Sequence, residues 1–204
     1  MRLLADHCNL YNAALEERRE AWRMRKVSVS YAMQSAQLKD IRKADPKGQG
    51  RHLFTAQQQT LHRLSTVFGA FYDRCKVGKT AGYPRFKPNS RFNQVRFVAG
   101  DGAKWTPAEV GGWARAHFQA IGSVKVKQHR TVPGTVKALQ IKREHRRWYV
   151  IVMSLWASVK MVGSTHRLRS NRRPAGTPRH RTRWRLRPGW FRRSKGAGRA
   201  PRPR

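Results

Sequence analysis

The sequence predicts an α+β fold: a helical bundle first, then a small antiparallel, β-barrel-like domain. Up to about residue 80 the apolar residues recur every three or four positions, which is the period of a helix face. Residues 81–155 instead alternate apolar and polar side chains or are β-branched, and Gly, Pro and Asp divide them into short runs. Residues 156–204 have neither period and are rich in Arg, Pro and Gly, so we expect a disordered basic tail there.

The net charge indicates a polyanionic partner. The chain carries 45 Lys and Arg against 10 Asp and Glu, a formal charge of +35 over 204 residues. Solubility needs far less charge, so we expect nucleic acid, both RNA and DNA, as the partner. No run approaches the roughly 18 apolar residues of a membrane-spanning helix. We therefore expect no membrane partner and a cytoplasmic, nucleoid-associated protein.

Three helices are expected in residues 1–80. The first has "EERRE" as its charged back, and its apolar face consists of Leu4, Cys8, Tyr11, Leu15 and Trp22. Ser30 has an N-cap side chain and starts a second helix, whose face carries Met33, Gln37 and Ile41. The third keeps the three-and-four spacing at Phe54, Leu61, Leu64, Phe68, Phe71 and Cys75. Because Cys8 and Cys75 both occupy apolar positions, we expect two buried, reduced thiols.

Four short antiparallel strands are expected at residues 92–97, 123–127, 135–143 and 146–153. Basic residues gather on one face of these strands and in the adjoining turn, namely Lys125, Lys127, His129, Arg130, Lys142 and Arg143. A basic sheet face of this kind fits a nucleic-acid surface, although the solvated face of any basic protein has the same pattern.

The stretch "AGYPRFKPNSRFNQVRF" interleaves aromatic and basic side chains. Tyr83 and Phe86 are the aromatic residues that we assign to binding, and the basic ones are Arg85, Lys87, Arg91 and Arg96. Aromatic rings stack on bases while cations follow the phosphates, so this mixture is typical of nucleic-acid contacts. The alternative is that Phe86 and Phe97 belong to the core and the prolines only shape a loop.

The sequence offers few candidate catalytic residues. A metal nuclease needs two or three carboxylates that converge on its ions. No pair here stands in a strand-borne Gly-x-Asp or similar setting, and we expect those on the helices to be solvated surface charges. The two cysteines form no Cys-x-x-Cys pair, so zinc is not expected. We expect no metal, no cofactor, no small-molecule substrate and no enzymatic activity.

Several segments together resemble one known family. "GYPRFK" follows the helical "QQQTLHRLSTVFGAFYDRCKVGK" and precedes "RFNQVRF", "IGSVKVKQHRTVPGTVKALQIKRE" and "RRWYVIV". In this order, over about residues 3–153, they resemble the N-terminal half of the TnpB proteins, also called OrfB, which are transposon-encoded relatives of type V CRISPR effectors. The opening "HCNLYNAALEERREAW" is similar to the end of that family's helix-turn-helix segment.

The resemblance implies a fold and a role. Residues 1–80 would be a recognition lobe and residues 81–155 a wedge-like barrel, in a family of transposases that cut DNA with a guide RNA beside a short target-adjacent motif. It also implies that Tyr31 and Gln58, which stand where the family has a Tyr and a Gln, help to read the target-adjacent duplex. Val98 stands where some members have Thr, so that contact is not expected.

The resemblance stops before the RuvC nuclease domain, whose Gly-Ile-Asp strand and zinc cysteines have no counterpart here. We therefore expect a truncated TnpB-like protein that binds nucleic acid without cutting it. GC-rich DNA translated in a wrong frame yields Arg, Pro, Gly and Ala, so one hypothesis is a frameshift near residues 154–163. The alternative is a structural RNA-binding protein of ribosomal type, whose Arg-rich arm is selected for phosphate contacts.

Translation of the locus in all three forward frames tests the frameshift hypothesis. We expect another frame to continue from "RRWYV" into a Gly-x-Asp strand and later Cys-x-x-Cys pairs. If no frame does so, the Arg-rich end belongs to the protein.

Overall fold

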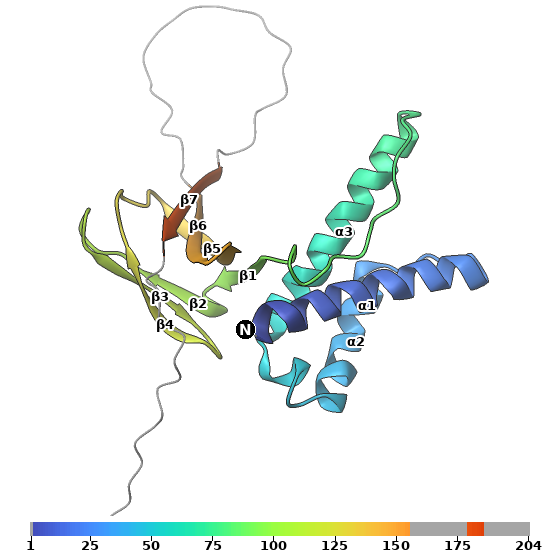
Figure 1. Ribbon diagram of the computed structural model, residues 1–204, viewed down its shortest axis with the longest axis horizontal. Coiled ribbons are helices and arrows are strands. Elements are labelled where there is room, and N and C mark those ends of the chain that lie inside the picture. Colours follow the sequence, from blue (N-terminus) through green and yellow to red (C-terminus); the bar gives the residue numbers. More distant parts are fainter. Residues whose placement is uncertain (1, 156–178, 186–204) are drawn as a thin grey trace, which may run out of the picture.

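Three helices lead the chain in the computed structural model, which describes residues 2–155 and 179–185 (Figure 1). They are α1 (Arg2–Arg25), α2 (Tyr31–Ala44) and α3 (Phe54–Lys76), with one 3-10 turn, η1 (Gln49–Arg51), before α3. The three expected helices are confirmed. The expected N-cap is confirmed as well, because the Ser30 hydroxyl accepts a hydrogen bond from the Met33 N–H at 3.3 Å.

The buried face of α2 differs from the expected one. Gln34 and Leu38 are buried, whereas Met33 is 49% exposed. The Gln34 amide nitrogen donates to the Ala14 carbonyl at 2.8 Å, and the amide oxygen accepts from Arg18 Nε at 2.8 Å. A hydrophobic pattern misses such a position, because its burial depends on hydrogen-bond partners that another helix supplies.

The two thiols also differ from expectation. Cys8 is buried, as expected, but Cys75 is exposed, so the prediction of two buried thiols is wrong for Cys75. Cys75 lies in the last turn of α3, where this helix extends away from α1 and α2 (Figure 1). The periodic pattern continues to the end of the helix, but within residues 2–155 and 179–185 no other helix or strand covers this final turn.

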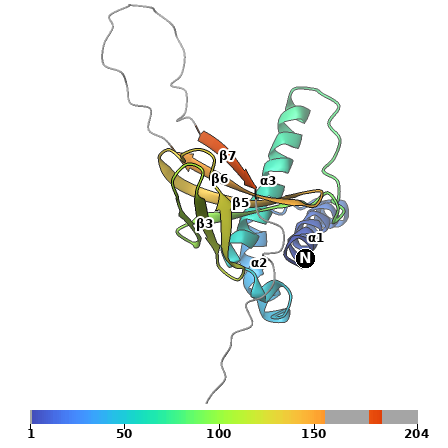
Figure 2. The same ribbon diagram turned by 60° about the vertical axis from the view of Figure 1, so that its left-hand side comes forward.

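Residues 94–155 form a curled mixed sheet that makes half of a barrel (Figure 2). Its strands are β1 (Gln94–Ala99), β2 (Gly102–Thr106), β3 (Trp113–Phe118), β4 (Gly122–Lys127), β5 (Thr135–Glu144) and β6 (Arg147–Leu155). With β7 (Arg179–Arg185) the strand order is β4-β3-β2-β1-β5-β6-β7. The four expected strands are confirmed as β1, β4, β5 and β6, and together with the helices they confirm the α+β fold class.

β2 and β3 lie outside the four expected strands, and β1 and β2 are not antiparallel. They pair in parallel at Val98–Gly102 and Ala99–Ala103, so the expectation of a purely antiparallel sheet is wrong here. Gly100 and Gly102 have φ values of 84° and 79°, a backbone that glycine adopts at little steric cost. The chain therefore passes from β1 to the adjacent β2 without reversing its direction.

Part of the tail is ordered. Arg179–Arg185 forms β7, which pairs antiparallel with β6 from Tyr149–Arg185 to Leu155–Arg179. The expectation of a disordered tail over residues 156–204 is therefore wrong for this segment, because an unpaired edge of β6 offers backbone partners whatever the tail's side chains. Residues 156–178 and 186–204 lie outside the described residues, and so does most of the range 154–163 in which the frameshift is hypothesised.

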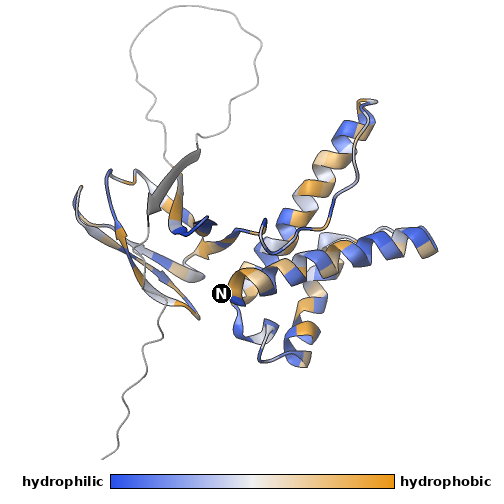
Figure 3. Cartoon of the chain, viewed as in Figure 1, coloured by the Kyte–Doolittle hydropathy of each residue, from blue (hydrophilic) through white to orange (hydrophobic). Residues whose placement is uncertain are grey.

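One hydrophobic cluster connects the helices with the sheet. Phe97 and Phe118 fill the inner face of the sheet with their rings 5.0 Å apart, while Phe92 is buried 6.0 Å from the Tyr11 ring of α1. Hydrophobic and hydrophilic residues alternate around the helices (Figure 3). The sheet is thus fixed on the helices by shared apolar contacts. No helix in the described part of the chain has the length and apolar character to span a membrane.

His7 gives the core a pH-dependent element. Its Nδ1 lies 2.8 Å from Thr60 Oγ1, and that hydroxyl donates its own proton to the Ala56 carbonyl at 3.1 Å. His7 therefore donates from Nδ1, and its buried Nε2, which has no partner in the described structure, carries the lone pair. Burial, together with a smaller effect of the nearby His52, lowers the pKa of His7 to about 3, and Asp6 opposes this shift.

We predict that the free energy of unfolding falls as the pH is lowered below 6.5. The unfolded chain takes up a proton at His7 near pH 6.5, whereas the folded chain does so only near pH 3, so stability present above pH 6.5 is lost between these values. The expected slope from this group approaches about 1.4 kcal/mol per pH unit. Urea unfolding at pH 6.5, 5.5 and 4.5 measures it, and His7→Gln, which keeps a donor but does not titrate, is expected to flatten the slope. Equal slopes in the two proteins would refute the assignment.

Two glycines provide a matched test of the β1–β2 step. At Gly102 a Cβ would overlap the Leu53 methyl groups and would meet a φ of 79°, whereas at Gly100, with a φ of 84°, it would meet nothing within 4 Å. We expect Gly100→Ala to cost about 1 kcal/mol of backbone strain. Gly102→Ala should cost about 1–3 kcal/mol more, because it also overpacks the contact with Leu53. Urea midpoints of the two variants check this, and equal losses would contradict it.

Candidate nucleic-acid interface

The segment between α3 and β1 is held on α1 by one asparagine side chain. Asn12 Oδ1 accepts from the Lys87 N–H at 2.9 Å, and Asn12 Nδ2 donates to the Lys87 carbonyl at 2.9 Å. The Cys8 thiol donates to the same carbonyl at 3.1 Å. Lys87 Nζ lies 4.7 Å from the Tyr11 ring centroid, and burial, with a smaller effect of Arg63, lowers the pKa of this lysine. Its ammonium group therefore lies against α1.

Arg85 and Phe86 lie beside the C-terminal half of α1. They share a surface hollow with Trp22, with two cations of that helix, Arg19 and Arg23, and with Lys26, which directly follows it. Arg91 follows in an exposed turn, where its N–H donates to the Pro88 carbonyl at 2.9 Å. The segment thus brings Arg85 and Phe86 into one cationic, partly aromatic surface with residues of the first helix.

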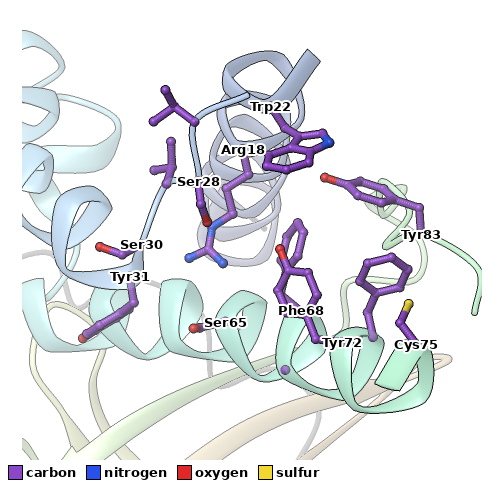
Figure 4. Close-up of a pocket in the computed structure, with 14 residues that line it drawn as sticks. Arg18, Trp22, Ser28, Ser30, Tyr31, Ser65, Phe68, Tyr72, Cys75 and Tyr83 are labelled. Atoms are coloured by element: carbon purple, nitrogen blue, oxygen red, sulfur yellow. The ribbon is translucent and has the colours of Figure 1, made fainter. Parts of the chain in front are cut away.

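A cleft of about 890 Å³ opens between α1, the start of α2, α3 and Tyr83 (Figure 4). Tyr31 and Tyr83 line it together with Trp22, Phe68, Phe71 and Tyr72. The Tyr83 ring lies edge-on to Phe68 at 5.6 Å and to Phe71 at 5.5 Å. Burial raises the pKa of Tyr83, and the neighbouring Tyr72 adds to the rise.

Tyr31 and Gln58, which the family resemblance singles out, both lie where α2 meets α3. The Tyr31 ring lies edge-on to the His62 ring at 5.7 Å. One helical turn away, Gln58 Nε2 donates to Ser35 Oγ at 3.0 Å. Tyr31 therefore lines the cleft, whereas Gln58 lies outside it and joins the two helices.

Arg18 lies in the cleft, although the sequence places it in the charged back of the first helix, "EERRE". Its Cζ is 5.0 Å from the centroid of the Phe68 ring and its Nε is held by Gln34, while its buried Nη2 has no hydrogen-bond partner in the described structure. Burial lowers the pKa of Arg18, and Tyr72 and Glu17 oppose the shift. Helical periodicity cannot find such a residue, because a buried arginine reads as part of the polar face.

The outer face of β2–β4 is basic from edge to edge, and we call it the outer sheet face. β3 alternates Ala114, Ala116 and Phe118 inside with Trp113, Arg115 and His117 outside. Across the strands, Arg115 stands opposite Lys125, Trp113 opposite Lys127, and His117 opposite Lys104. Lys127 Nζ lies 5.3 Å from the Trp113 ring centroid and also donates to the Gly111 carbonyl. The sequence "WARAHF" carries this alternation, which is the signal that could have revealed β3 and its outward-facing Arg115.

The remaining expected site residues are spread around the sheet. His129 and Arg130 are exposed in the loop after β4. Lys142 forms an ion pair with Glu144 at 2.6 Å, and Arg143 lies over the Trp148 ring at 5.9 Å, so both have partners within the sheet. Arg96 is exposed on β1 and lines a hollow with Arg63 and His62 of α3. The expected residues therefore form several surfaces, of which the outer sheet face and the cleft are the best defined.

Several of the described carboxylates have structural partners. Asp6 pairs with Arg51 and His52; its burial opposes the lowering of its pKa, which the hydrogen bonds from these two residues bring about. Asp45 accepts from the backbone N–H of Gly48 and Gln49, and Glu17 accepts from Gln34 and Gln37. In residues 2–155 and 179–185 no three His, Cys, Asp or Glu side chains lie close enough together to hold a metal ion.

Comparison with known proteins adds no family assignment. Neither the scan against protein-family models nor the search of curated proteins finds a match to this chain.

Proposed function

We propose that this chain binds RNA and DNA, with the outer sheet face as its main phosphate-contacting surface. The observation that carries the proposal is the juxtaposition of Arg115 and Lys125 directly across β3 and β4. Like charges in directly opposed positions destabilise a strand pair. A polyanion that contacts both side chains removes the repulsion and releases its own counterions, so it is the partner that this surface fits best.

The second part of the proposal is that the chain acts as a TnpB-like, transposase-class fragment. Its helices would correspond to the recognition lobe and its sheet to the wedge barrel of that family. The support is that Tyr31 and Gln58 lie along the same contact between α2 and α3, through His62 and Ser35 respectively. The proposed activity is binding without cleavage, which would hold the chain at the nucleoid. Mg²⁺-dependent cutting of a labelled duplex by the purified chain would overturn this part.

A structural RNA-binding protein of ribosomal type is the alternative, and one observation favours it. Arg179–Arg185 supplies β7 of the sheet, as expected of an arm that belongs to the fold. The two functions differ in the RNA that they select. A TnpB-like fragment should prefer a transcript of its own transposon end, whereas a ribosomal-type protein should bind structured RNA of equal length without that preference. Competition between these two RNAs separates the functions.

We predict that Arg115→Gln combined with Lys125→Gln weakens binding to a duplex of about 20 base pairs by roughly tenfold at moderate salt. The plot of log affinity against log salt should become shallower by about 2, because two phosphate contacts are lost. Fluorescence anisotropy with a labelled duplex at several salt concentrations measures both effects.

The matched control removes two cations from α2, with Lys39→Gln and Lys43→Gln. Both lysines are exposed and lie outside the outer sheet face. This control lowers the net charge equally, so it should leave the salt slope nearly unchanged. Equal losses of slope in the two double variants would mean that binding follows overall charge, and the outer sheet face would not be the site.

A further inference from the structure

The cleft between the helices contains a buried cation with a vacant donor. Arg18 is only 8% exposed, and its Nη2 lacks a hydrogen-bond partner in the described part of the chain. A buried, unpaired donor on a charged group is strongly unfavourable, and proteins rarely retain one without a ligand or a partner. Arg18 is held in place by its bond to Gln34 and by the Phe68 ring, so the vacant nitrogen has a fixed direction.

Aromatic side chains form much of the lining of the cleft. Figure 4 shows the Arg18 guanidinium pointing into the cleft, with Trp22 and Tyr83 on one side of it and Tyr31 on the other. Trp22 is 55% exposed, so part of its ring is accessible to a ligand, and Lys26 Nζ lies 5.8 Å from the ring centroid. The volume of about 890 Å³ lies within the range of small-ligand sites.

We propose that this cleft binds one unpaired nucleobase of a single-stranded segment, stacked on the aromatic walls, with Arg18 donating to an acceptor on the edge of the base. The inference rests on the proposed function, since the base belongs to a strand that the chain has bound. It goes beyond it by adding a second site, distinct from the outer sheet face, with a different ligand chemistry.

Other classes of ligand would interact either with the aromatic rings or with Arg18, but not with both. An aliphatic ligand would cover the rings but leave Arg18 Nη2 unpaired. A phosphate would pair with Arg18 but gain nothing from the aromatic faces. A base within a duplex has both faces covered by its neighbours and cannot enter, so the ligand must be an unpaired base, for which stacking and one edge contact act together.

The exposed Cys75 lines the cleft and serves as a reporter. Cys8 is buried and burial raises the pKa of its thiol, so a maleimide should modify Cys75 first. The full chain is saturated in turn with a single strand of about 12 nucleotides, with the same strand made abasic, and with the blunt duplex. We expect the single strand to slow modification of Cys75 by about fivefold or more, because a bound base covers the thiol. The other two should leave the rate unchanged.

Two variants test the aromatic lining and the buried arginine of the cleft separately. Trp22→Ala should weaken binding of the single strand by about tenfold, as for the loss of one stacked base, and leave duplex binding unchanged. Met24→Ala is its control, since Met24 is 71% exposed on the same helix and lies outside the cleft. Arg18→Gln should also cost about tenfold for the single strand. Arg25→Gln, an equal loss of charge at an exposed position of α1, is the control for that change.

The outcomes separate the two proposals. Saturable binding of all probes with equal protection of Cys75 by the abasic strand would show that the cleft holds backbone and not base, and would overturn the inference. Equal weakening of single strand and duplex by Trp22→Ala would overturn it too. If neither the single strand, the abasic strand nor the duplex binds saturably, the proposed function itself fails. A failure of the cleft proposal alone would leave duplex binding intact, so the two results can be told apart.

Discussion

The hydrogen bond between Arg18 and Gln34 is the interaction on which the helical half depends. Gln34 receives Arg18 Nε on its oxygen and uses its nitrogen for the Ala14 carbonyl and for Glu17, so α1 and α2 are joined by one polar cluster. Phe68 of α3 lies against the same guanidinium. The three helices therefore meet at a charge that could not be buried without these partners. The same arrangement fixes the direction of the vacant nitrogen, so packing and the proposed base site have one cause.

The sheet is positioned by a different set of contacts, made by the segment between α3 and β1. The Asn12 side chain makes hydrogen bonds with both the N–H and the carbonyl of Lys87, as an adjacent strand would. Phe92 follows a few residues later and is buried between the helices and the sheet. From that anchor β1 enters the sheet with its apolar side inward. The cations of β3 and β4 must then face outward, because their neighbours Ala116 and Val126 fill the core. The outer sheet face is thus a consequence of the alternation and of the side on which the helices pack.

Local patterns predicted much of the fold and less of the site. Ser30 was accessible to prediction because capping is local, and β5 and β6 because they are long strands and β6 contains the β-branched run 150–152. β2 is harder to predict because it has only five residues and begins at a glycine, and β3 because its alternation depends on small apolar side chains, Ala114 and Ala116. Gln34, Arg18 and Cys75 share another reason: their burial or exposure is decided by which helix lies beside them, and no residue near them in sequence carries that information. The cleft therefore emerges only in three dimensions, although Tyr31 and Tyr83 were already candidates.

Charge also links the fold to its partner. Arg115 and Lys125 are like charges in directly opposed positions of β3 and β4, and His117 stands opposite Lys104 beside them. This repulsion lowers the stability of the folded state but is much weaker in the extended, solvated unfolded chain. A ligand that binds the folded state and neutralises these cations must then stabilise it through mass action. Under the proposed function, the stability of the sheet is therefore coupled to the nucleic acid that the chain binds.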